Sequence, residues 1–194
     1  CTLTFNALER ESLGKRLTQF EKDSWKKIVE NVQSGNDENY HVGDTKKLRF
    51  AQHTNDCGTL DYNSFPFECV STLDQERDVT VRIANKSKCT NGETSETACG
   101  FVIEFADIIE NHTMNPSTDN NNWGTSVGGW KDSNLRNYLN TVTYSSLPED
   151  LRKGVSLTKV VSGYGKNGTD TSNFATNDYL YLLSSKEIWG TSKF

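Results

Sequence analysis

Five cysteines constrain this chain more than any other feature, because four of them fall in two close pairs. Cys57 and Cys69 enclose one turn-rich segment, Cys89 and Cys99 enclose a second, and Cys1 is left over. Neither pair has C-x-x-C spacing and the histidines are scattered, so the pattern does not favour a zinc site. We therefore expect disulfides, each worth roughly 3 kcal/mol through the entropy of loop closure. Four cysteines permit three connectivities, and spacing alone does not choose among them.

The size and charge of the chain limit the classes of protein it can be. Its 194 residues, of which 34% are hydrophobic, suffice for one buried core and are short for two ordinary domains. Acidic and basic residues are interleaved, with a net charge of −5 and no lysine-arginine block, so no nucleic-acid partner is expected. No stretch approaches the roughly 20 apolar residues of a membrane helix, so we expect no membrane insertion. Disulfides form in oxidising compartments, which predicts an extracellular protein on a cell surface or a virion.

The order of sequence patterns predicts one domain with a short leading segment. Residues 1–22 are interpreted as a linker or the remnant of a preceding repeat, and residues 23–194 as a single domain. A helix is expected between Ser24, a suitable N-cap, and Gly35, because apolar residues recur there with helical spacing. Strands interspersed with short helices, without a βαβ rhythm, predict an α+β fold of antiparallel sheets with short flanking helices. Short helices are expected after Ser133 and Leu147, and strands at 47–52, 69–73, 79–84, 100–105, 157–161 and 179–183.

The motifs that could carry catalysis are weak. Residues 163–168 match G-x-G-x-x-G, but turn residues follow where a helix should start, so a glycine-rich loop is the better interpretation. Ser24 fits the S-x-x-K pattern of penicillin-interacting enzymes, whose K-T-G and S-D-N elements do not occur. Glu104 and Asp107 are the carboxylates most expected to be partly buried, with a structural role. The sequence therefore predicts no enzyme, no cofactor and no metal site.

A polar stretch at residues 115–129 is the candidate ligand-binding segment. Long ordered loops usually have a function. Amide side chains beside an aromatic ring suit a carbohydrate, because hydroxyl groups pair with amides and the C–H face of a sugar packs on a ring. The alternative is a solvated loop whose tryptophan packs inward. The candidate residues are Asn115, Asp119, Asn120, Asn121, Asn122 and Trp123.

The segment that follows predicts a corner that defines the fold. Two glycines permit a sharp turn, a tryptophan buries a large surface, and a serine caps the next helix. Arg136 could clamp a neighbouring carboxylate or backbone carbonyls. These residues are therefore interpreted as structural rather than ligand-binding. They are Gly128, Gly129, Trp130, Ser133, Arg136, Leu139 and Asn140.

This corner is part of an ordered set of motifs that resembles a known family. Residues 128–140 follow the pattern G-G-W-x-x-S-x-x-R-x-x-L-N, which is similar to the signature of a bacterial domain family of unknown function. The resemblance spans residues 24–190. Its other pieces, in the same order, are residues 25–35, 40–45, 112–115, 147–151 and 178–190.

The resemblance implies a module of Gram-positive surface proteins and of prophage tail or fibre proteins, similar to C-type-lectin-like folds. No catalytic residues are established for that family, so none is carried over. Two features depart from its pattern: the cysteine pairs between residues 57 and 99, and the end of the chain at Phe194, where such a fold has further strands. The domain is accordingly expected to be incomplete at its C-terminus.

The expected function follows from these points together. The first hypothesis is a surface-displayed binding or adhesion module that recognises a glycan or a protein. The second is a receptor-binding or structural component of a phage tail or fibre. The third is a hydrolase of cell-wall polymers, which would need two carboxylates converging in a cleft.

Overall fold

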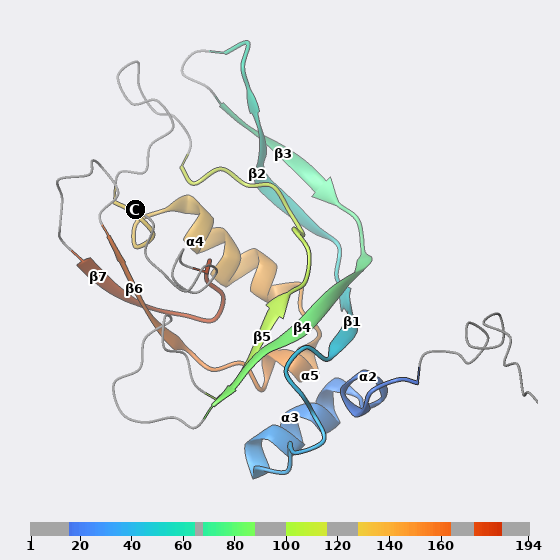
Figure 1. The fold of residues 1–194 in the computed structure, drawn as a ribbon. Coiled ribbons are helices and arrows are strands. Elements are labelled where there is room, and N and C mark those ends of the chain that lie inside the picture. Colours follow the sequence, from blue (N-terminus) through green and yellow to red (C-terminus); the bar gives the residue numbers. More distant parts are fainter. Residues whose placement is uncertain (1–15, 65–67, 88–99, 116–127, 164–172, 184–194) are drawn as a thin grey trace, which may run out of the picture.

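The computed structural model describes residues 16–64, 68–87, 100–115, 128–163 and 173–183 (Figure 1). Its sheets are antiparallel and its helices are short, which confirms the predicted α+β class. No helix in these ranges is long and apolar enough to cross a membrane. The helices are α2 (Gln19–Lys22), α3 (Trp25–Ser34), α4 (Asn134–Tyr138), its π-helical continuation η2 (Leu139–Thr143) and α5 (Glu149–Arg152). The strands are β1 (Thr45–Phe50), β2 (His53–Asp61), β3 (Glu68–Asp74), β4 (Arg77–Ser87), β5 (Gly100–Phe105), β6 (Thr158–Gly163) and β7 (Asn173–Asp178).

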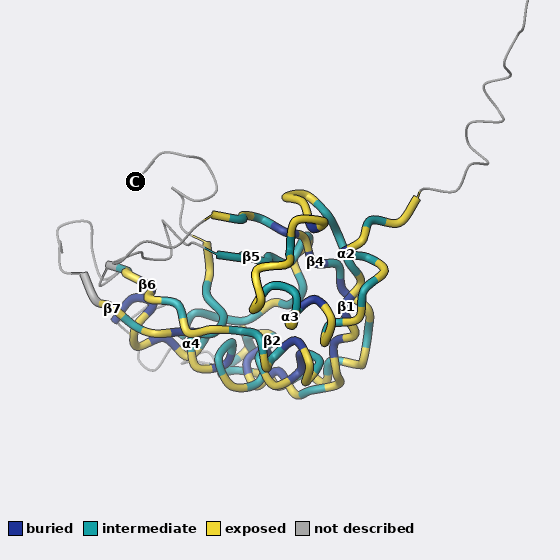
Figure 2. The backbone as a smooth tube through the Cα atoms, turned by 90° about the horizontal axis from the view of Figure 1, so that it is seen from below, coloured by how far each residue is buried: buried dark blue, intermediate teal, exposed yellow. Residues whose placement is uncertain are grey.

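A three-stranded sheet in the order β1-β4-β5 supports the core. Buried and exposed positions alternate along β1 and β4 (Figure 2), as strand geometry requires when one face is covered. Val79, Val81 and Ile83 all lie on the buried face of β4, as predicted. Leu147, just before α5, and Leu151, within it, pack against this face and close the larger apolar cluster.

The N-terminal helices form a second apolar cluster against the same sheet. Ser24 caps α3 by accepting a hydrogen bond from the backbone N–H of Lys27, and Gly35 ends the helix with φ of 73°, as predicted. At the end of the expected linker, Phe20 on α2 is fully buried and packs against Tyr40. An aromatic ring buried this deeply ties its helix to the core, so the folded part begins before residue 23.

The β2–β3 hairpin extends away from the three-stranded sheet (Figure 1) and is closed by a disulfide. Cys57 and Cys69 are bonded, with their Cα atoms 4.6 Å apart, so the sequential pairing exists for this pair. The pairing of the two strands shifts between Asn55 and Thr59, beside the disulfide. Cys1, Cys89 and Cys99 lie outside the described residues.

The C-terminal part contains α4, η2, α5 and the two-stranded sheet β6-β7. The expected strand at 157–161 corresponds to β6, but the strand expected at 179–183 is wrong. Strand β7, the last within the described ranges, ends at Asp178, and the backbone N–H groups of Tyr179 and Leu180 donate to the side chain of Asn140. These donors are therefore occupied by a side-chain oxygen instead of a strand partner.

Candidate functional site

The corner at residues 128–140, which we call the signature corner after the pattern in its sequence, is organised around one buried carboxylate, Asp178. Trp130 Nε1 donates to its Oδ2 at 2.8 Å, and Arg136 Nε donates to its Oδ1 at 2.7 Å. The hydroxyl of Thr176 supplies a third donor to Oδ2 at 2.6 Å. With its side chain fully buried, Asp178 is compensated by these contacts. Arg136 thus clamps a carboxylate.

The remaining signature residues shape the backbone around this carboxylate. Ser133 Oγ accepts from the N–H of Arg136 and donates to the carbonyl of Trp130. Asn140 Oδ1 accepts two backbone N–H groups that follow β7, and its Nδ2 donates to the carbonyl of Leu180. Leu139, partly buried, begins η2.

The two signature glycines occupy left-handed backbone conformations, with φ of 84° at Gly128 and 56° at Gly129. A Cβ atom on Gly128 would also lie 2.7 Å from the Cβ of Asp132. The turn therefore favours glycine for two reasons, backbone conformation and space. The signature residues join α4 to the end of β7, so their role is structural.

The candidate ligand-binding segment lies mostly outside the described residues. Of its candidates, only Asn115 is described, and its Oδ1 accepts a hydrogen bond from the N–H of Asn134 at 3.0 Å. Binding by this segment stays a prediction. The candidates outside the described residues are Asp119, Asn120, Asn121, Asn122 and Trp123.

The two carboxylates expected to be partly buried do not form a catalytic pair with each other. Glu104, on β5, accepts a hydrogen bond from Arg82 Nε at 2.8 Å across the β4–β5 pairing. Asp107, beyond the end of β5, is exposed. Glu104 has the hydrogen-bonded structural role that the sequence suggested.

An open groove of about 590 Å³ lies beside the start of α3. We call it the α3 groove. Its walls come from β1, β4 and the first residues of α5, and its lining combines one aromatic ring with charged groups of both signs. The lining residues are Ser24, Trp25, Lys46, Lys47, Arg49, Asp78, Pro148, Glu149 and Asp150.

Neighbouring contacts hold the cations of the α3 groove in place. Lys46 Nζ donates to the carbonyls of Glu21 and Asp23, at 2.9 and 2.7 Å, and lies 5.5 Å from the centre of the Trp25 ring. Burial lowers the pKa of Lys46, although nearby carboxylates oppose that shift. Arg49 makes ion pairs with the exposed carboxylates of Glu76 and Asp78.

On the facing wall, Glu149 pairs with Lys153 at 2.9 Å, and this hydrogen bond lowers the pKa of the Glu149 carboxyl. The groove therefore presents carboxylate acceptors and ammonium or guanidinium donors around an apolar ring.

A second group of polar side chains, largely shielded from solvent, lies where the β2–β3 hairpin begins. We call His53, Asp74 and Glu110 the hairpin-base cluster. His53 opens β2 and faces Asp74, the last residue of β3, in the antiparallel pairing. His53 Nε2 lies 3.6 Å from Asp74 Oδ2 and 3.4 Å from Glu110 Oε1. The exposed fractions of the side chains of His53 and Glu110 are 6% and 5%, and that of Asp74 is 25%.

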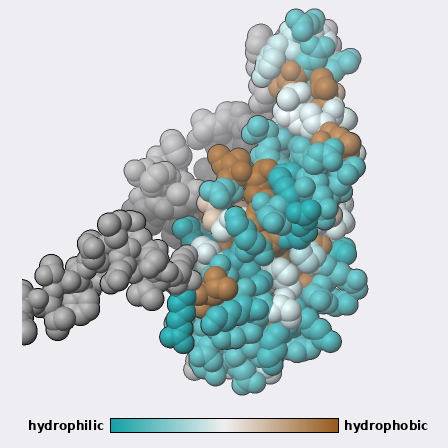
Figure 3. Space-filling model, turned by 90° about the vertical axis from the view of Figure 1, so that its right-hand side faces the viewer, coloured by the Kyte–Doolittle hydropathy of each residue, from teal (hydrophilic) through white to brown (hydrophobic). Residues whose placement is uncertain are grey.

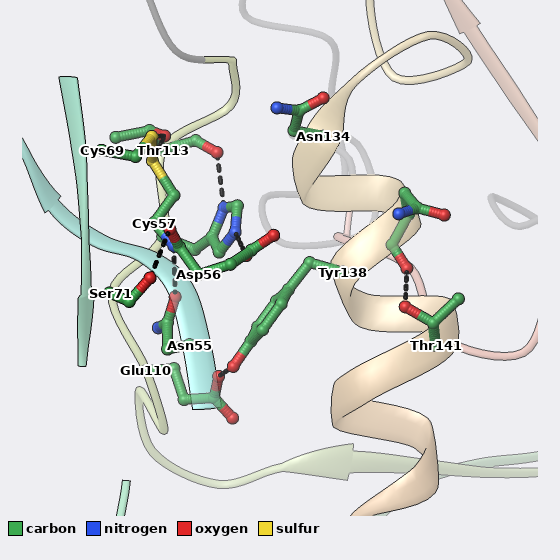
Figure 4. Close-up of polar contacts among 12 residues, drawn as sticks. Asn55, Asp56, Cys57, Cys69, Ser71, Glu110, Thr113, Asn134, Tyr138 and Thr141 are labelled. Carbon is green, nitrogen blue, oxygen red and sulfur yellow. Dashed lines mark hydrogen bonds and ion pairs between the residues drawn. A yellow bond between two sulfur atoms is a disulfide. The ribbon is translucent and has the colours of Figure 1, made fainter. Parts of the chain in front are cut away.

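The hairpin-base cluster is braced by α4. Tyr138 reaches from α4 to donate a hydrogen bond to Glu110 Oε2 (Figure 4), and His112 stacks on the Tyr138 ring with centroids 4.4 Å apart. Burial, followed by the hydrogen bond to Glu110, raises the pKa of Tyr138 well above its usual value. On the hairpin side, Asn55 Nδ2 donates to the carbonyl of Asn111 at 2.7 Å, which holds the segment carrying Glu110 against β2.

Sequence reasoning missed the hairpin-base cluster. Its members are far apart in the chain and match no ligand motif, and the three histidines of the chain are scattered along the sequence. Only the pairing of β2 with β3 brings His53 and Asp74 opposite each other. Along the sequence, His53 lies at the start of one strand and Asp74 at the end of the next. That signal becomes informative once the register between the two strands is known.

Comparison with known protein families gives a match to a family of unknown function. The family described as Domain of unknown function (DUF6273) matches residues 105–193, a range that contains Glu110, Tyr138 and the signature corner but neither His53 nor Asp74. No curated protein and no solved structure matches the chain. The expectation of a family of unknown function is therefore confirmed in this coarse form: residues 105–193 match the DUF6273 family.

Proposed function

We propose that this chain is an extracellular binding module that holds a glycan in the α3 groove. The observation that carries the proposal is the composition of that groove, in which Trp25 lies among donors and acceptors on β1, β4 and α5. A sugar presents hydroxyl groups that need hydrogen-bond partners and a C–H face that packs on an aromatic ring. The groove offers both kinds of contact.

One face of the molecule has a surface that suits a polar ligand. The face drawn in Figure 3 is mostly hydrophilic, and its hydrophobic groups lie in separate patches. Partners that dock through apolar contact use larger continuous patches. A ligand recognised by hydrogen bonds and charge is more compatible with this surface.

The extracellular part of the proposal is supported by the disulfide between Cys57 and Cys69. Disulfides persist in oxidising environments and are rare where thiols are kept reduced. This disulfide also fixes the hairpin that packs beside the DUF6273 segment, through the contact of Thr113 with Cys57.

A glycan array that includes cell-wall polysaccharides tests the proposal. Lys47→Gln and Glu149→Gln, which alter exposed groups on opposite walls of the groove, should each weaken binding about 5-fold, the effect of one lost hydrogen bond. Lys159→Gln and Glu38→Gln make the same chemical changes at exposed positions outside the groove and should have no effect.

The proposal fails if no glycan binds, or if the control variants weaken binding as much as the groove variants do. Loss of binding in Trp123→Ala, with Lys47→Gln unaffected, would instead place the site in residues 115–129.

A further inference from the structure

We propose that the hairpin-base cluster is a Zn²⁺ site, with His53, Asp74 and Glu110 as its protein ligands. Within the described ranges, it is the only set of three or more His, Cys, Asp or Glu side chains arranged to hold a metal ion. Its ligand atoms all lie within 4.8 Å of one another. This site is separate from the α3 groove and does not depend on glycan binding.

The two distances from His53 Nε2 to the carboxylates fit zinc better than a hydrogen-bonded ion pair. A tetrahedral Zn²⁺ with bonds of about 2.0–2.1 Å keeps its ligand atoms roughly 3.3–3.4 Å apart. His53 Nε2 lies 3.4 Å from Glu110 Oε1 and 3.6 Å from Asp74 Oδ2. A protonated imidazole that donated to either carboxylate would approach it to about 2.7–2.9 Å.

Two atoms of the cluster are buried and lack a hydrogen-bond partner among the described residues: His53 Nε2 and Glu110 Oε1. Both face the centre of the cluster, since they lie 3.4 Å apart. Buried polar atoms are nearly always satisfied, because leaving one unpaired costs free energy. A bound cation would satisfy both atoms at once.

The surrounding contacts prepare these two atoms as ligands. His53 Nδ1 lies 2.9 Å from the carbonyl of Ala51, to which it donates its N–H, so the lone pair of Nε2 points toward the carboxylates. Tyr138 donates to Glu110 Oε2, which leaves Oε1 for the metal. Outer contacts of this kind orient metal ligands in proteins.

The charge of the cluster also calls for a cation. In the described parts of the chain, neither Asp74 nor Glu110 makes an ion pair with lysine or arginine. A buried carboxylate without a counter-charge, such as that of Glu110, is costly. Three protein ligands with one imidazole suit Zn²⁺, whereas Ca²⁺ takes six to eight oxygen ligands. The partly exposed side of Asp74 leaves access for the ion and a water ligand.

Isothermal titration calorimetry of Zn²⁺ into the metal-free full chain tests this site. The protein is kept oxidised and treated with iodoacetamide, so that no free thiol competes for the metal. We expect one equivalent of Zn²⁺ to bind. Tyr138→Phe should weaken binding about 10–100-fold by removing the outer contact, and Asp74→Asn at least as much by removing a ligand. His41→Gln removes an exposed histidine beside Asp44 and should have no effect.

Absence of Zn²⁺ binding, equal affinity in all variants, or loss of binding in His41→Gln would overturn the proposal. Zinc-soaked crystals of the unaltered protein provide a measurement that does not require the variants to fold. Anomalous density among His53, Asp74 and Glu110 is expected there, and density only at other positions would contradict the site.

Discussion

At the scale of single residues, Asp178 explains why the signature corner is structural. Its buried carboxylate accepts hydrogen bonds from Trp130, Arg136 and Thr176, which come from two separate parts of the chain. A buried charge is tolerated when it is paired and hydrogen-bonded, and it becomes costly when one partner is removed. The polar groups of this corner are therefore engaged in holding the fold.

Replacing Arg136 with methionine should lower the free energy of unfolding by about 3 kcal/mol, because Asp178 would lose its counter-charge inside the protein. Urea denaturation measures this loss. Arg49→Met is the matched control, since Arg49 pairs with exposed carboxylates and its loss should cost much less. Similar losses in the two variants would contradict the role given to Asp178.

At the scale of elements, Tyr40 connects α2 to α3 through hydrogen bonds. Its phenol donates to Asp23 Oδ2, just after α2, and accepts from Asn31 Nδ2 on α3, both at 2.7 Å. Its ring packs edge-on against Phe20. The helices and the segment before β1 consequently share one small apolar cluster. Within it, the hydroxyl group of Tyr40 both donates and accepts a hydrogen bond.

Alkaline pH should reduce the stability that Tyr40 contributes to the folded chain. Burial, followed by the hydrogen bond to Asp23, raises the pKa of Tyr40 from 10.0 to about 12. The unfolded chain loses this proton near pH 10.0 while the folded chain keeps it, so stability is complete below pH 10.0 and falls as the pH rises toward about 12. Urea denaturation across this range measures the decline.

Tyr40→Phe should make that decline less steep, without abolishing it, because Tyr138 and Tyr144 also have pKa values raised by burial. Tyr62→Phe, at an exposed position, should leave the decline unchanged. If the two variants follow the same pH dependence, Tyr40 is not responsible for it.

At the scale of the whole molecule, the hairpin and the C-terminal part meet at the hairpin-base cluster. Glu110 touches His53 from one side and Tyr138 from the other, so three segments converge there. Arg77, at the start of β4, adds a hydrogen bond to the carbonyl of Ile109 at 2.7 Å. The DUF6273 segment thus depends on residues outside its matched range for its packing.

Local features of this architecture were predictable from the sequence. Ser24 and Gly35 mark the ends of α3, and Val79, Val81 and Ile83 mark the buried face of β4, because capping and strand alternation depend only on near neighbours in the chain.

Features that depend on distant contacts were not predictable. The apolar run at residues 179–183 has the composition of a strand, yet Asn140 holds the backbone at its start. Phe20 lies in a charged stretch of the sequence, and it is buried because it packs against the distant Tyr40. The cluster of His53, Asp74 and Glu110 requires the register of a sheet, which no local pattern contains.

Glycan binding in the α3 groove is tested most directly by an NMR titration of the ¹⁵N-labelled full chain with a glycan that binds on the array. Saturable shifts are expected at the Trp25 indole, Lys47 and Glu149, with little change at Asn63 in the hairpin turn. Shifts confined to residues 115–129, or no saturable shift at all, would contradict the assignment of glycan binding to the α3 groove.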